Sequence, residues 1–183
     1  MSLKPSTYIV GAWIGTFVSL IPCVALAPQD FRENLGISDY GIEPLTVVPY
    51  SLGLLASVCL LGLATRALHR KSILQQRAHL GLRAVAILQL ALLLVPDFNT
   101  AAFHHAHVSV GVTLFVTEGI LGLCFSVWGQ LKALDSTVLV LLILAGISSF
   151  LSLINRIGWL GPSEIAFQLS FLTLCVAGIR RIE

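Results

Sequence analysis

Residues 45–67, LTVVPYSLGLLASVCLLGLATRA, form a long apolar run that indicates the fold class of this chain. Its only charged residue is Arg66, close to its end. A helix needs about 20 predominantly apolar residues to cross the roughly 30 Å hydrocarbon core of a lipid bilayer. Backbone groups in lipid must pair within their own segment, so such a run forms a helix rather than an open strand. Residues 45–67 therefore predict a transmembrane helix.

Comparable apolar runs lie on both sides of this stretch. The six predicted transmembrane helices cover residues 8–27, 45–67, 80–95, 107–130, 136–155 and 162–179. The first run is longer than the apolar core of a signal peptide, about 7–15 residues, and is interpreted as a retained helix. The composition agrees, because 56% of the residues are hydrophobic and 11% are charged, against roughly 25% charged in soluble domains. We expect an all-α integral membrane bundle that forms a single domain over residues 1–183.

Basic residues concentrate on one side of the predicted membrane. With the N-terminus in the cytoplasm, nine of the eleven Lys and Arg residues face the cytoplasm and only Arg32 and Arg156 do not. This distribution follows the positive-inside rule. It predicts an even number of helices with both termini in the cytoplasm. The net charge of +2 gives no indication of a nucleic-acid partner.

The cytoplasmic loop after the second predicted helix is the most basic segment. Clusters of about 4–8 basic residues beside a cytoplasmic helix end can bind anionic lipid headgroups. Membrane lipids are therefore expected partners, although the positive-inside rule alone already requires most of these charges. The candidate headgroup contacts are Arg66, Arg70, Lys71 and Arg77.

Two polar residues fall near the middle of predicted helices. Glu118 has apolar neighbours on both sides within residues 107–130, and Gln89 lies near mid-depth in residues 80–95. A carboxyl group at this depth is costly and tends to face a partner or a cavity. One interpretation is a structural hydrogen bond to another helix, with Gln89 as the candidate partner. The other is a proton relay or a contact to the polar group of a substrate.

A cluster of His104, His105 and His107 follows Asp97 at the exterior start of the fourth predicted helix. His104 and His107 are spaced i, i+3 and share a face in a helix. Asp97, His104 and His107 could ligate zinc, and together with Asp39 they could perform acid–base chemistry. No HExxH motif or further strong ligand is evident, so the preferred interpretation is a set of interfacial histidines that hydrogen-bond to the loop backbone and to Asp97. We expect no cofactor.

The segment Ile37-Ser38-Asp39-Tyr40-Gly41-Ile42-Glu43-Pro44 resembles an element of the DRAM/Frag/Sfk group of six-helix membrane proteins, and of related prokaryotic six-helix proteins of unknown function. In that group an ISD-x-G-x-x-P element closes the first exterior loop. A second similarity runs from residues 97–99 through the histidines to Gly111 and Phe115, and a third is Ser163-Glu164 at the start of the last helix. The family-like motif residues are Ser38, Asp39, Gly41, Pro44 and Glu164.

This resemblance implies contacts on the exterior side among Asp39, Asp97, His104 and Glu164. It also implies roles in lipid handling or in the regulation of partner proteins, since members act in autophagy, in maturation of GPI lipids and in phospholipid or sterol distribution. It supplies no catalytic mechanism.

Three functional hypotheses remain open at this stage. The first is a non-enzymatic multi-pass protein that interacts with lipids or regulates another membrane protein, because the sequence holds no complete catalytic signature. The second is a membrane-embedded, lipid-modifying hydrolase with an exterior Asp/His site. The third is a small proton-coupled carrier that uses Glu118. The ligand and the oligomeric state are not indicated.

Overall fold

The computed structural model describes residues 3–28, 36–69, 71–95, 101–128, 133–154 and 158–183. This part of the chain is helical and contains no strand. Six long helices form the bundle, and a short 3-10 helix, η1, spans Ile37–Gly41. The long helices are α1 (Pro5–Leu26), α3 (Val47–Ala67), α4 (Ile73–Leu94), α5 (Ala101–Trp128), α6 (Ala133–Leu153) and α7 (Leu160–Ile182).

All six long helices are long and apolar enough to cross a membrane. Most of the residues in these apolar segments are not buried inside the bundle. The buried share ranges from 22% in α6 to 39% in α4 and α7. Large aliphatic side chains therefore cover the outer surface. Soluble proteins rarely expose an apolar area of this size to water. The chain is a multi-pass membrane bundle, and the predicted fold class and number of helices are confirmed.

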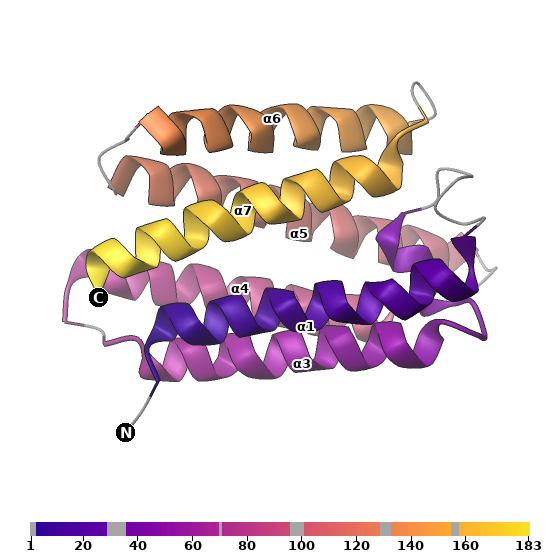
Figure 1. Ribbon diagram of the computed structural model, residues 1–183, viewed down its shortest axis with the longest axis horizontal. Coiled ribbons are helices and arrows are strands. Elements are labelled where there is room, and N and C mark those ends of the chain that lie inside the picture. The colour runs from indigo at the N-terminus through magenta and orange to yellow at the C-terminus, as the bar shows by residue number, and fades with distance from the viewer. Residues whose placement is uncertain (1–2, 29–35, 70, 96–100, 129–132, 155–157) are drawn as a thin grey trace.

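Helix α7 holds the bundle together. Figure 1 shows α1, α3 and α4 grouped on one side and α5 and α6 on the other, with α7 crossing between them. The crossing helix contacts α1, α4, α5 and α6. Its Phe171 is fully buried and its ring centroid lies 5.4 Å from that of Trp13 on α1. The main core is thus built where α7 meets its neighbours.

The start of α4 differs from the prediction. The helix begins at Ile73 rather than at residue 80, because a capping box stabilises its N-terminus. The Ser72 hydroxyl accepts a hydrogen bond from Gln75 N, and Gln75 Oε1 accepts one from Ser72 N, both at 3.2 Å. This S-x-x-Q pattern starts helices independently of hydrophobicity. The helix therefore extends beyond its apolar part, as does α5, which begins at Ala101 rather than at residue 107.

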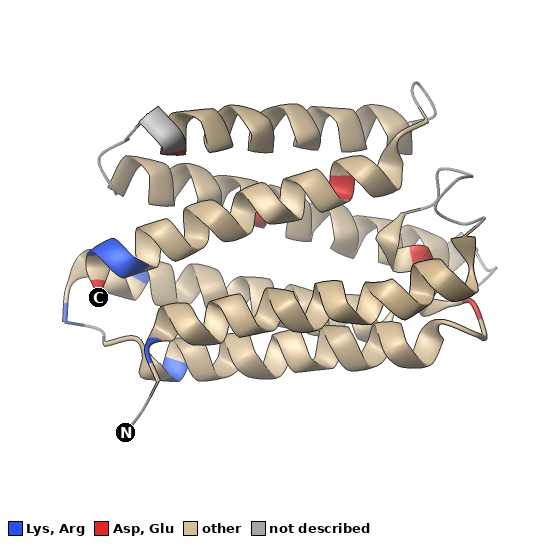
Figure 2. Cartoon of the chain, viewed as in Figure 1, with Lys and Arg blue, Asp and Glu red and all other residues tan. Residues whose placement is uncertain are grey.

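Both chain termini lie at the same end of the bundle, as Figure 1 shows. Gln75 Nε2 donates to the carbonyl of Ile182 at 2.7 Å, and Arg181 pairs with the buried Asp135 at 2.5 Å. Figure 2 shows Lys and Arg gathered at this end. Of the predicted headgroup contacts, Arg66, Lys71 and Arg77 are exposed here. Arg70 lies outside the described residues.

Glycines allow two close helix contacts. A Cβ atom at Gly53 of α3 would collide with the side chain of Ser19 on α1 and lie 3.2 Å from the carbonyl oxygen of Gly15. A Cβ atom at Gly178 of α7 would collide with the ring of Phe125 on α5. Small residues permit such approach between membrane helices. These contacts fix α1 against α3 and α7 against α5.

Candidate functional site

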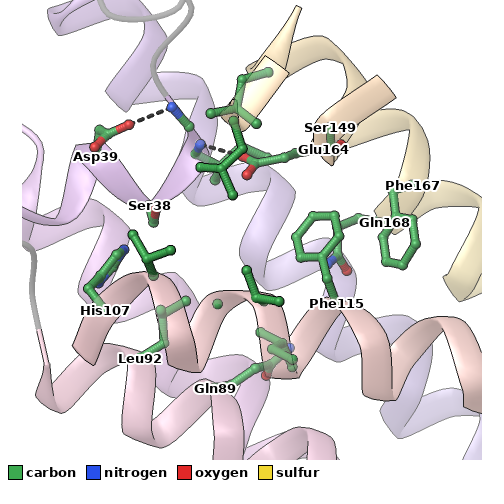
Figure 3. Close-up of a pocket in the computed structure, with 18 of the residues that line it drawn as sticks. Ser38, Asp39, Gln89, Leu92, His107, Phe115, Ser149, Glu164, Phe167 and Gln168 are labelled. Carbon is green, nitrogen blue, oxygen red and sulfur yellow. Dashed lines mark hydrogen bonds between the residues drawn. The ribbon is translucent and has the colours of Figure 1, made fainter. Parts of the chain in front are cut away.

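A cavity of about 500 Å³ occupies the half of the bundle opposite the chain termini. Figure 3 shows side chains of η1, α5 and α7 around it, and residues of α1, α3, α4 and α6 complete the wall. Most of the wall is apolar, and the rings of Phe115 and Phe167 stack within it at 4.4 Å between centroids. The polar residues that also line the cavity include Ser38, Asp39, Gln89, His104, His107, Ser149, Glu164 and Gln168.

One side of this cavity reaches the outer surface of the bundle between α5 and α6. Val112 and Val116 of α5 line the cavity and are 42% and 54% exposed. Phe150 and Leu153 of α6 also line it and are 58% and 40% exposed. The same side chains therefore belong to the cavity wall and to the surface that faces lipid. The cavity has a lateral opening toward the bilayer.

The helix η1 roofs the cavity, where Asp39 caps its start and Glu164 of α7 holds it in place. Asp39 Oδ2 accepts a hydrogen bond from Gly36 N at 2.5 Å, and Glu164 Oε2 accepts one from Ile37 N at 2.6 Å. A Cβ atom at Gly36 would lie 3.4 Å from oxygens of both groups. The hydrogen bond from Ile37 N to Glu164 thus joins the segment 37–44 to the start of α7.

Two further contacts fix the end of this roof. The Thr46 hydroxyl donates to the carbonyl of Tyr40 at 2.8 Å. Gly41 lies against the ring of Tyr50, where an added Cβ atom would stand 3.0 Å away. The motif residue Pro44 follows at an exposed position between η1 and α3. The segment 37–44 therefore acts as a packed cover rather than as a simple turn into the next helix.

The three histidines at the start of α5 differ in burial and in contacts. His107 is 7% exposed and its Nδ1 lies 2.8 Å from the carbonyl oxygen of Val95. Since a carbonyl only accepts, Nδ1 carries the proton and donates. His104 also lines the cavity, so the predicted common face of His104 and His107 is confirmed. His105 is exposed, with its ring centroid 5.9 Å from that of His104.

The described residues contain no group of three or more His, Cys, Asp or Glu side chains that could hold a metal ion. Asp97, which the sequence placed beside the histidines as a ligand or catalytic group, lies outside the described residues. Two other candidate catalytic groups hydrogen-bond to the backbone. Asp39 accepts from Gly36 N, and His107 donates to the carbonyl of Val95.

The partner of Glu118 is Gln168, not Gln89. Gln168 Nε2 donates to Glu118 Oε2 at 2.7 Å. Glu118 is fully buried and does not line the cavity, whereas Gln168 does. Gln89 instead accepts a hydrogen bond from Ser57 Oγ at 2.9 Å. Gln168 was not among the predicted polar residues, although a glutamine within the apolar run 162–179 is the same kind of signal that indicated Gln89.

No protein-family model, curated protein or solved structure matches this chain.

Proposed function

We propose that this chain is a non-enzymatic membrane protein that binds an amphipathic lipid in the cavity beneath η1. The observation that carries the proposal is the lateral opening, where Val116 and Phe150 are both cavity wall and outer surface. A lipid chain can pass from the bilayer into such a cavity without crossing water. An exterior roof with polar side chains then meets the polar end of the same molecule.

The size and lining of the cavity support a lipid as the occupant. Sites for small molecules enclose roughly 300–1,000 Å³ and combine apolar walls with a few placed polar groups. The cavity of about 500 Å³ lies within that range. Its apolar walls suit one hydrocarbon chain, and the polar groups of His107 and Glu164 stand at the roofed end.

The distribution of charge supports an orientation with both termini in the cytoplasm. Lys4 precedes α1, Arg66 lies in the last turn of α3, and Arg180 and Arg181 lie in the last turn of α7. All these positions belong to the end that carries the termini. By the positive-inside rule this end faces the cytoplasm, so the cavity opens in the exterior half of the membrane.

The contacts of the polar groups favour binding over catalysis and over proton-coupled transport. The backbone bonds of Asp39 and His107 suit a structural role for both. Glu118, on which a carrier would depend, lies behind Gln168 and outside the cavity wall. Lipid binding requires neither group to react.

A pair of glycine substitutions tests this function. Gly111 lines the cavity, and a Cβ atom there would meet only Leu92 Cδ1, at 4.0 Å. Gly111→Leu should therefore place its side chain in the cavity and displace the lipid. Gly62→Leu is the matched control, because Gly62 is also within a helix and has nothing within 4 Å of an added Cβ atom.

The measurement is native mass spectrometry of the purified full chain after incubation with 1-mono-oleoylglycerol. Wild type and Gly62→Leu should retain one lipid, and Gly111→Leu should retain none. Equal retention by wild type and Gly111→Leu, or no retention by wild type, would overturn the proposal.

A further inference from the structure

Gln89 lines the cavity and has a side-chain donor, Nε2, that bonds to no described residue. Its side chain is only 6% exposed, and it lines the cavity from α4. Ser57 Oγ donates to its Oε1 at 2.9 Å, which fixes the amide plane. No described residue accepts a hydrogen bond from Nε2. An amide nitrogen carries two N–H donors, and Nε2 is not among the fully buried polar atoms without a partner. These donors are therefore accessible from the cavity and can bind an acceptor oxygen on the bound molecule.

Acceptor atoms lie at the roofed end of the same cavity. In an imidazole whose one proton is on Nδ1, Nε2 is an acceptor, and no described residue hydrogen-bonds to His107 Nε2. Glu164 uses Oε2 for Ile37 N, while no described residue donates to its Oε1. These two atoms favour a donor, such as a hydroxyl group, on the bound molecule.

The described lining residues include two carboxyl-bearing side chains, Asp39 and Glu164, and no Lys or Arg. Proteins that bind phosphate groups supply Arg or Lys to pair with the negative charge. Removing an anion from water without such a partner is strongly unfavourable. The lining is therefore matched to an uncharged polar group and mismatched to a phosphate.

We infer that the cavity selects single-chain lipids whose polar group is uncharged and carries hydroxyl and carbonyl oxygens, and that Gln89 is a specificity-determining residue. This inference rests on the proposed lipid binding and adds the chemical class of the ligand. Gln89 donates to the carbonyl oxygen, and His107 Nε2 and Glu164 Oε1 accept from hydroxyl groups. A glycerol monoester has all of these groups. Its phosphorylated form adds a negative charge, and no Lys or Arg among the described lining residues can pair with it.

The test compares two probes that differ by one phosphate group, 1-mono-oleoylglycerol and 1-oleoyl-lysophosphatidic acid. Dissociation constants are measured for the full chain in a neutral detergent, with Gly111→Leu defining binding outside the cavity. The uncharged probe should bind at least about tenfold more tightly. If both probes bind in a Gly111-dependent manner with equal affinity, the selectivity is overturned while the proposed function stands. If neither probe shows Gly111-dependent binding, both are overturned.

The variant Gln89→Leu tests whether Gln89 recognises the polar group of the lipid or only supports the shape of the cavity. It should weaken binding of 1-mono-oleoylglycerol about three- to tenfold, the loss for one neutral hydrogen bond. Binding of 1-octadecene, which has no polar group, should not change. Ser57→Ala is the control, because it removes the partner of Oε1 but leaves both N–H donors. Equal weakening of both probes by Gln89→Leu, or no weakening of either, would overturn the role of Gln89.

Discussion

Gln168 Nε2 donates a hydrogen bond to Glu118 Oε2 at 2.7 Å, and Gln168 Oε1 accepts one from Trp13 Nε1 at 3.1 Å. One amide thus joins three helices, since Glu118 lies on α5, Gln168 on α7 and Trp13 on α1. Glu118 is fully buried, and within the described residues its Oε1 has no partner. The bridge from Gln168 is therefore the main compensation for placing a carboxyl group at this depth.

Gln168→Leu should destabilise the bundle by about 1–3 kcal/mol, because it leaves buried Glu118 Oε2 without its donor. The measurement is the free energy of unfolding, or the Tm of the protein in detergent. The control on the same helix is Thr173→Val, since exposed Thr173 donates only to the carbonyl of Leu169.

The double variant Glu118→Leu/Gln168→Leu should recover the part of this loss that comes from the unpaired Glu118 Oε2, because both partners of that bond are then apolar. Trp13 Nε1 lacks its acceptor in the single and in the double variant alike. A double-mutant cycle with no coupling between the two positions would contradict the structural role of the bridge.

Gly178→Ala should destabilise the protein by about 1–3 kcal/mol, the usual cost of overpacking a core. The added methyl group would collide with Phe125, which is 1% exposed and has no space to move. Gly62→Ala is the control, since its Cβ atom enters open space and both changes have the same effect on helix propensity. Thermal unfolding of the two variants checks this. Equal Tm values would show that α5 and α7 pack less closely than described.

Glu164→Leu should loosen the roof of the cavity, because Ile37 N loses its acceptor. A hydrogen bond to a carboxylate contributes about 1.5–3 kcal/mol, so amide exchange in the segment 36–41 should accelerate at least about tenfold. Hydrogen-exchange mass spectrometry measures this rate. Glu164→Gln keeps an oxygen in place and should retain most of the protection. Glu43→Gln, outside this contact, should leave the rate unchanged.

A C-terminal fusion of green fluorescent protein should be fluorescent, and a C-terminal fusion of alkaline phosphatase should be inactive. Both outcomes follow if the basic end of the bundle faces the cytoplasm. A phosphatase inserted after Glu43, between η1 and α3, should be active. The reverse pattern would place the cavity in the cytoplasmic half of the membrane and remove the proposed orientation.

The sequence was sufficient for the six helices because each one must be apolar for about 20 residues to cross lipid. It was less informative about their ends. Residues 73–79 contain Gln75, Gln76 and Arg77, so a search for apolar runs excluded them although they are helical. The Ser72–Gln75 capping box was the available signal.

The cavity and the pairing of Glu118 could not be derived in the same way. Position along a helix gives the depth of a side chain, and Gln89 and Gln168 both lie at a depth where a partner for Glu118 was expected. Only the packing of α7 against α5 decides between them. The resemblance implied contacts among Asp39, Asp97, His104 and Glu164. Asp39 and Glu164 both accept hydrogen bonds from the backbone at residues 36–37, and Asp97 lies outside the described residues.

The close contact at Gly53 means that substitutions between α1 and α3 cost more than substitutions at the lateral opening. Any side chain at this position would have to force α1 away from α3, since Ser19 and the backbone of Gly15 already fill the space. At the lateral opening, Val112 and Val116 line the cavity and are 42% and 54% exposed, so exchange among aliphatic residues there is less constrained. New ligand preferences could therefore arise between α5 and α6 by single substitutions, while the α1–α3 pair stays fixed as the frame.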